Sequence, residues 1–242
     1  MPMADMPALS SADCLNLWEL GAGLHPLDQA LLVLARALPE APEETLVDLP
    51  LGRRNMALAE LRCASFGRRL VGWTVCRRCG EKLEVEVDGQ MLAGGVTDQG
   101  QSREEPIFVN GRSFRLITTR DVAQAAQVND VRQACLRLLE SCCLDTEKSI
   151  VCSDEELDQI GQKLAMGDPL AETRLALRCP VCENEWEENL DMVSFLWREI
   201  EARARRLLFE IHTLASAYGW TEATILSLSE RRRAIYMEMA QA

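Results

Sequence analysis

Two short stretches decide the fold: "VCRRCGEKLEVEV" at residues 75–87 and "LRCPVCENEWEENL" at residues 177–190. Each places two cysteines three positions apart and then continues into a segment that reads as a strand. Two such turns supply four thiolates, which complete the tetrahedral shell of a structural zinc ion. The sequence therefore predicts one structural Zn²⁺ site. Its expected ligands are Cys76, Cys79, Cys179 and Cys182.

The two cysteine pairs lie about a hundred residues apart, so the segment between them has to fold with its ends together. Closing a loop of that length costs on the order of 4 kcal/mol. A structural zinc ion contributes roughly 10–16 kcal/mol of apparent binding free energy, which outweighs that cost. Four cysteines also leave no open coordination position, and this argues against catalytic zinc.

Two other interpretations of the cysteine pairs stay open, namely a thioredoxin-like redox pair and coincidental spacing. A redox pair of that kind opens a helix after a strand. Here Gly80 and a strand-like run follow Cys79, and the motif occurs twice. The neighbouring cations Arg77, Arg78 and Lys82 favour the thiolate form that metal binding requires.

The remaining six cysteines show no ligand spacing, and we expect buried free thiols in a reducing compartment. They are Cys14, Cys63, Cys135, Cys142, Cys143 and Cys152. The N-terminal stretch has no basic region followed by an apolar one. The sequence therefore predicts no secretory signal and a cytoplasmic location.

Composition and motifs disfavour several classes of function. A net charge of −12 disfavours sequence-independent binding to a nucleic-acid backbone. No window is long and apolar enough for a transmembrane helix, so we expect no membrane association. The chain has no Gly-rich phosphate loop, no G-x-S-x-G and no H-E-x-x-H motif. The sequence therefore singles out no catalytic residue.

Hydrophobic periodicity predicts an α+β fold dominated by helices. The expected parts are a flexible N-terminal segment at 1–23, a helical pair at 24–70, a split zinc ribbon with a helical insert at 71–190, and a C-terminal helical segment at 191–242. One helix of the insert is expected from Asp121 through Cys143. The last part is expected to be a long helix that ends at Gly219, followed by two short helices.

The C-terminal segment carries the candidate partner-binding residues. Its long helix has an apolar stripe, which includes Leu207, Leu208 and Ile211, larger than two short helices can easily cover. Aromatic and arginine residues cluster at and after the end of this helix, a composition typical of protein–protein interfaces. They are Tyr218, Trp220, Arg231, Arg232 and Tyr236. A packing role for the aromatic residues stays open beside the binding role.

The C-terminal run "FLWREIEARARRLLFEIHTLASAYGWTEATILSLSERRRAIYMEM" at residues 195–239 resembles the C-terminal signature of the tailed-phage baseplate-hub assembly chaperone family. Relatives of that family also occur with phage-tail-like contractile injection systems. Upstream, "LHPLDQALLVLARAL" (24–38) and "LPLGRRNMALAELRCASFGRRL" (49–70) resemble the first two helices of the family. Asn55 stands where the resemblance leads us to expect an aspartate.

The resemblance extends to the cysteine turns and to the chain between them. "CRRCGEKLEV" (76–85), "FRLITTRDV" (114–122) and "LRCPVCENEW" (177–186) resemble the two knuckles of the family and the turn that separates them. Glu183 follows Cys182 at a position where the family-type turn has a glycine.

The resemblance implies a non-enzymatic protein-binding factor or component in the assembly of a contractile tail or injection-system baseplate. It implies a baseplate or hub protein as the partner and a bacterial cytoplasmic location, with retention in the assembled particle left open. The alternative is a zinc-ribbon module that binds nucleic acid or a transcription complex. Acidic residues intersperse the basic cluster at 231–233, which favours a solvated or protein-binding face over a nucleic-acid face.

Overall fold

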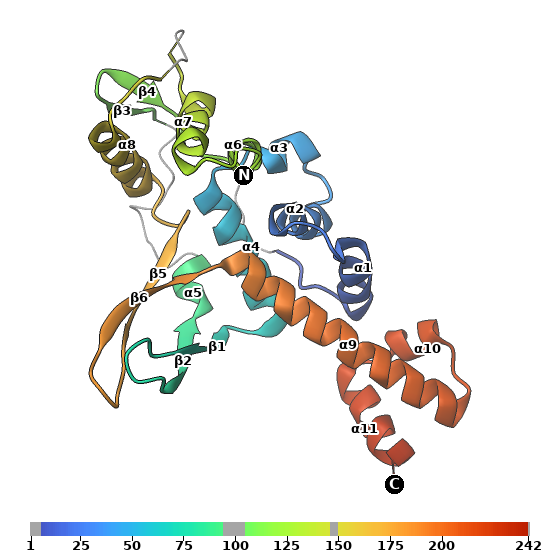
Figure 1. Ribbon diagram of the computed structural model, residues 1–242. Helices are drawn as coiled ribbons and strands as arrows, with labels where there is room; N and C mark the ends of the chain where they lie inside the picture. The colour runs from blue at the N-terminus through green and yellow to red at the C-terminus, as the bar shows by residue number, and fades with distance from the viewer. Residues whose placement is uncertain (1–5, 94–104, 146–149, 242) are drawn as a thin grey trace.

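The computed structural model describes residues 6–93, 105–145 and 150–241. It is a mixed α+β fold in which helices dominate and the described strands form separate antiparallel pairs (Figure 1). The C-terminal part consists of α9 (Met192–Tyr218), α10 (Glu222–Ser227) and α11 (Glu230–Gln241). The predicted fold class is thus confirmed, together with the long helix and the two short helices after it.

The prediction of a flexible segment at 1–23 is wrong for Ser11–Gly21, which form the helix α1, and its first five residues lie outside the described part of the chain. Ser10 and Asp13 make a capping box, in which each side chain accepts the backbone N–H of the other residue. The helix packs against α9 and buries Leu17. The sequence-based prediction missed this helix because the segment contains small residues and prolines. The element that stabilises the helix, α9, lies far along the chain.

The predicted N-terminal helical pair is present as α2 (Pro26–Ala37) and α4 (Leu51–Phe66). A short helix, α3 (Glu43–Val47), lies between them. The start of α2 is fixed by proline at its first position and by His25, whose Nδ1 accepts the N–H of Leu27 at 3.2 Å. Through this hydrogen bond His25 caps the helix, with its Nδ1 acting as the acceptor.

The main core lies where α1, α2 and α4 pack against the first half of α9 (Figure 1). Its fully buried side chains come from both ends of the chain and include Leu34, Leu58, Leu61, Leu196 and Ile200. Burying one such side chain contributes about 1.5–3 kcal/mol. The N-terminal helices and α9 therefore stabilise one another.

The apolar stripe of α9 is buried only in part. Leu207 lies in a second small cluster with Cys14 and Leu15 of α1, whereas Leu208 is exposed. The two short helices indeed leave part of the stripe uncovered, because successive residues of a helix point about 100° apart and the neighbouring helices cover only one side. The covering element is α1, which the sequence-based prediction had left unstructured.

The insert between the cysteine pairs has a core of its own around Phe114. Its elements are β3 (Ile107–Val109), β4 (Arg112–Phe114), α6 (Thr119–Ala125), α7 (Val131–Cys142) and α8 (Asp154–Gly167). The prediction of one helix from Asp121 through Cys143 is wrong. The carboxylate of Asp130 accepts the N–H of Gln133 and caps α7, so the chain breaks into two helices.

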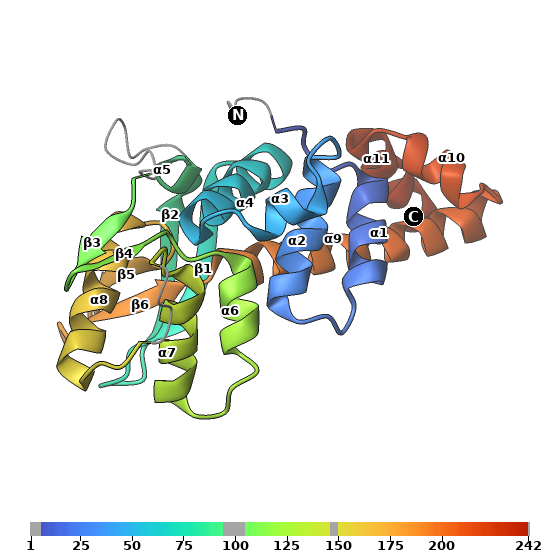
Figure 2. The ribbon, with the colours of Figure 1, turned by 90° about the horizontal axis from the view of Figure 1, so that it is seen from above.

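Seen from above, the insert and the cysteine hairpins lie at one end of the molecule, and α10 and α11 lie at the other (Figure 2). Gly219 ends α9 in the left-handed conformation with φ 68°, which turns the chain back toward α9. Over the described residues, no helix has the length and apolar character needed to cross a membrane.

Candidate metal centre

The four cysteines lie at the tips of two antiparallel hairpins of the same construction. β1 (Arg69–Val75) pairs with β2 (Lys82–Asp88), and β5 (Thr173–Arg178) pairs with β6 (Glu185–Leu190). A short helix, α5 (Gly89–Ala93), follows β2. Side chains along β2, β5 and β6 alternate between half-buried and exposed. Each hairpin therefore has one apolar face and one solvent face.

The two C-x2-C turns have the same backbone hydrogen bonds. In the first turn the N–H of Cys76 donates to the Glu81 carbonyl at 2.8 Å, and the N–H of Gly80 donates to the Cys76 carbonyl at 2.9 Å. In the second turn the N–H of Glu183 donates to the Cys179 carbonyl at 2.9 Å. Because the backbones match, both turns present their thiols in the same manner.

The residue after the second cysteine has a positive φ in both turns, 76° at Gly80 and 57° at Glu183. Glycine adopts this conformation without cost, whereas a residue with a Cβ atom pays about 1–2 kcal/mol. Glu183, where the family-type turn has a glycine, therefore keeps the turn geometry at an energetic cost. The stability of the whole cluster has to offset that cost.

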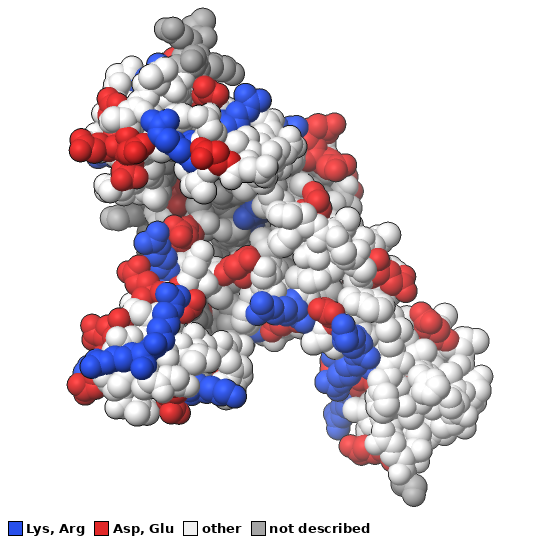
Figure 3. Space-filling view, in the orientation of Figure 1, with Lys and Arg blue, Asp and Glu red and all other residues white. Residues whose placement is uncertain are grey.

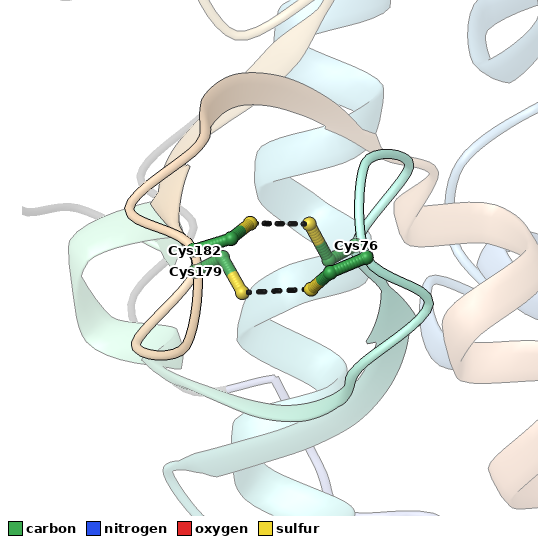
Figure 4. A group of neighbouring side chains, drawn as sticks. Cys76, Cys179 and Cys182 are labelled. Atoms are coloured by element: carbon green, nitrogen blue, oxygen red, sulfur yellow. Dashed lines mark hydrogen bonds between the residues drawn. The ribbon is translucent and has the colours of Figure 1, made fainter.

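The four thiols converge between the two turns, where the labelled cysteines point toward one another (Figure 4). Sγ of Cys76 lies 3.6 Å from Sγ of Cys182, and Sγ of Cys79 lies 3.6 Å from Sγ of Cys179. All four sulfur atoms lie within 4.8 Å of one another. A tetrahedral ion with metal–sulfur bonds of about 2.3 Å needs sulfur atoms about 3.8 Å apart. The cluster therefore fits one metal ion bound by all four predicted ligands.

Electrostatics within the cluster also favour a bound cation. Hydrogen bonds from the backbone N–H groups of Cys79 and Arg78 lower the pKa of the Cys76 thiol to about 6. The backbone N–H of Glu81 lowers the pKa of Cys79, but the neighbouring sulfur atoms, Cys182 first, raise it to about 12. One thiol thus ionises readily and another resists, because thiolates so close together repel. A metal cation removes that repulsion and allows all four to ionise.

Glu188 of β6 ties the two hairpins together beside the thiols. Its carboxylate accepts hydrogen bonds from Thr74 Oγ1 at 3.4 Å and from Trp186 Nε1 at 3.2 Å, and it lies 3.6 Å from the Arg77 guanidinium. Arg77, which was expected to offset the thiolate charge, is therefore shared with a carboxylate. Contacts of this kind orient the two turns before and after metal binding.

The other six cysteines lie outside the cluster and are free thiols in the structure. Burial raises the pKa of Cys14 to about 11 and the pKa of Cys142 to about 12. Thiols with such values stay protonated at neutral pH and react slowly. The expected burial is therefore confirmed for Cys14, Cys142 and Cys143, whereas the other three cysteines are only partly buried.

The three aromatic residues of the predicted partner-binding set come together at the far end of α9. The Tyr218 ring stacks on Trp220 with centroids 4.7 Å apart, and Tyr236 meets both rings edge-on at 5.9 and 4.9 Å. The packing role that the sequence left open for these aromatic residues is therefore present. Arg231 and Arg232 are exposed on α11. The binding role stays a prediction.

A buried ion pair beside this aromatic group was missed in the sequence. The Arg233 side chain is 2% exposed and donates to Glu210 Oε2 at 3.0 Å, to the Leu228 carbonyl at 2.6 Å and to Ser11 Oγ at 3.1 Å. Arg206 donates to the other oxygen of Glu210 at 2.9 Å. The only signal was an arginine triplet among glutamates, read as a solvated face. That prediction is wrong for its third arginine, which anchors α11 on α9.

Asn55 has a role that an aspartate cannot fill. Its Nδ2 donates to the carbonyls of Leu170 and Ala171 at 2.9 and 3.1 Å, while its Oδ1 accepts from Arg54. A carboxylate at this position has no donor for the two carbonyls. The amide therefore links α4 to the chain that leads from the insert into β5.

Comparison of the chain with protein-family models, with curated proteins and with solved structures finds no match. The class that the structure defines is a mixed α+β protein with two hairpins joined through a four-cysteine cluster that fits a metal ion.

Proposed function

We propose that the four-cysteine cluster binds one structural Zn²⁺. The observation that carries this proposal is the set of sulfur–sulfur distances, which suits a tetrahedral site with no vacant position. A closed set of four thiolates suits zinc or iron, and zinc, which has no redox chemistry, is the ion of closed structural sites of this kind. The bound ion would hold together hairpins that are 100 positions apart in sequence, so its binding energy would become folding energy.

Metal analysis of the purified chain tests this proposal. Inductively coupled plasma mass spectrometry should find about one zinc per chain. Cys182→Ser should lose the metal, whereas Cys135→Ser, in the insert and outside the cluster, should keep it. Iron in place of zinc, or a folded chain without metal, would refute the assignment.

We further propose that the chain is a non-enzymatic protein-binding factor or component in baseplate assembly of a contractile tail or injection system, with a baseplate or hub protein as its partner. The sequence resemblance supports this, since it covers most of residues 24–240 and is most specific in the C-terminal run. A cytoplasmic site of action in a bacterium, with or without retention in the particle, belongs to the same proposal.

The observation that best supports protein binding is an exposed apolar and cationic surface on the C-terminal helices. Phe209 of α9 and Ile235 and Met239 of α11 are exposed apolar side chains, and the exposed Arg231 and Arg232 lie on α11 as well. Exposed apolar residues beside arginines are typical of surfaces that a partner covers.

Co-purification with candidate hub proteins encoded near its gene tests this function. We expect capture by the wild-type chain and at least about tenfold weaker capture by the double variant Arg231→Glu and Arg232→Glu, because interface arginines contribute strongly to binding. A matched control is Arg137→Glu on α7, an exposed arginine at the opposite end of the molecule. No capture of any hub protein, or equal capture by the double variant and the wild-type chain, would contradict the proposal.

The nucleic-acid alternative gains no specific support from the cysteine hairpins. Their solvent faces carry Glu84 and Glu86 on β2 and Glu185 and Glu187 on β6. Carboxylates on these faces repel phosphate groups, although arginines lie between them. Salt-dependent retention on DNA would be needed to revive this alternative.

A further inference from the structure

A groove of about 680 Å³ lies between the cysteine hairpins and the first turns of α9. It opens on the notch that separates the hairpin lobe from the arm of α9 to α11 (Figure 3). β1 lines the groove with the consecutive residues 70–74, whereas β2 contributes only Val85 and Val87. A strand that presents consecutive residues to a groove exposes its edge to it, and a strand that presents alternate residues exposes one face. The free edge of β1 therefore borders the groove.

The hydrogen-bond register shows which backbone groups of β1 are unpaired. Cys76 pairs with Glu81 at one end of the hairpin, and the N–H of Gly89 donates to Arg68 at the other. In an antiparallel pair every second residue bonds to its partner, and the residues between point away. Val71 and Trp73 fall between, so their N–H and C=O groups point toward the free edge. The described residues provide no backbone partner for them outside the hairpin.

The side chains on this edge are also exposed and apolar. Val71 is 36% exposed, Val75 51% and Trp73 71%. Edge strands of soluble proteins are usually protected by a charge, a proline or a bulge. β1 has none of these between residues 70 and 75. The edge thus has the properties of a strand that pairs with another chain.

The charges in the groove indicate the chemistry of the occupant. Three carboxylates line the groove, and each of them is engaged: those of Glu188 and Glu199 pair with arginines, and that of Asp191 caps the start of α9. Arg198, on the first half of α9, is exposed and forms no ion pair with any described residue. An occupant with a carboxylate complements this cation.

We propose that the free edge of β1 binds an extended segment of a partner protein as an added strand, with apolar side chains at alternate positions and a carboxylate that pairs with Arg198. Backbone hydrogen bonds to Val71 and Trp73 provide affinity, and the apolar groove between the hairpins selects the side chains. The inference rests on the proposed protein-binding function and identifies a second contact, apart from the C-terminal helices.

Selection of peptides on the zinc-loaded full-length chain tests the proposal. A displayed library of random linear dodecapeptides should yield sequences with alternating apolar residues and an acidic residue. Fluorescence anisotropy measures the affinity of these peptides for each variant. Val71→Pro should bind them at least about tenfold more weakly than wild type, because proline removes the edge N–H. Val71→Ala keeps that N–H, so its affinity should stay within about threefold of wild type. Val71 N–H makes no bond within the hairpin, so the proline variant should keep its zinc.

Arg198→Glu should weaken the same peptides, whereas Arg137→Glu should not. If no peptide is enriched, or if Val71→Pro binds the selected peptides as tightly as wild type, the proposal is refuted. A wild-type dimer that Val71→Pro converts to a monomer would show that a second copy occupies the edge, and this too would overturn the proposal. The library contains no hub protein, so these outcomes are independent of hub capture by the C-terminal helices.

Discussion

Replacing Arg233 with methionine should loosen the C-terminal helices far more than replacing any other arginine of the same triplet. Arg233→Met keeps the length and apolar stem of the side chain and removes all three of its hydrogen bonds. Removing one partner of a buried ion pair typically costs about 3–5 kcal/mol, since the other charge stays buried without compensation. Arg206 remains on Glu210, so we expect the lower end, about 3 kcal/mol.

The assay is native-state hydrogen exchange of the α11 amides, supported by urea unfolding followed by circular dichroism. Urea is preferable to guanidinium because it does not screen ion pairs. Hydrogen exchange reports the free energy of local opening even when the rest of the chain stays folded. Arg231→Met, at an exposed position, is the matched control and should change that free energy by less than about 0.5 kcal/mol.

A double-mutant cycle separates the ion pair from simple loss of packing. Arg233→Met combined with Glu210→Met should be less destabilised than Arg233→Met alone, because two apolar side chains leave no buried charge. The reasoning is refuted if Arg233→Met opens α11 no more easily than Arg231→Met. It is also refuted if the double variant is at least as unstable as the sum of the two single variants.

Three further predictions concern the cysteine turns and the insert. Cys79→Ser should abolish zinc binding and unfold the hairpins, because a structural zinc ion contributes on the order of 10 kcal/mol of folding energy. If metal analysis finds zinc in this variant and circular dichroism shows that it is folded, the prediction is contradicted. Glu183→Gly should be about 1 kcal/mol more stable against urea than Glu183→Ala, since glycine tolerates the positive φ at no cost. Equal stability of the two variants would show that the backbone at residue 183 is not strained. Burial would raise the pKa of Asp121, but hydrogen bonds from Arg115 and Thr118 lower it overall. This carboxylate therefore stabilises the fold at any pH above its unfolded pKa of about 4. The stabilisation is lost as the pH falls through the lower pKa of the folded state. Asp121→Asn should therefore cost about 2 kcal/mol at pH 7 and progressively less below pH 4 in urea titrations; a cost independent of pH would exclude a charge effect.

The local features of the fold were predictable from the sequence. Cysteine spacing and alternating residues predicted the hairpins and the four clustered thiols, because both signals act over a few residues. The length of α9 followed from its apolar period and from Gly219, which is the kind of residue that ends helices. Such signals do not depend on what the element packs against.

The features that escaped prediction depend on contacts between distant residues. α1 is stabilised by α9, and the Arg233 guanidinium reaches Ser11 across 222 positions. A sequence window around Ser11 mixes leucines with small and polar residues and shows no long apolar stripe, and a window around Arg233 shows a charged surface pattern. The break between α6 and α7 was also missed, although Asp130 is a good cap, because the apolar pattern continues through it.

The ribosome synthesises α9 long after the helices whose core it completes. While α1, α2 and α4 emerge, Leu34, Leu58 and Leu61 have no α9 to pack against, and the first cysteine turn has no second turn. The insert core is different, because all its residues lie between 107 and 164, so it can fold during synthesis. The positions of the two cores along the chain thus predict that the insert folds first, and that the N-terminal core and the cysteine cluster form together afterwards. A chain that stops before α9 exposes its main core, which makes truncated products targets for proteolysis.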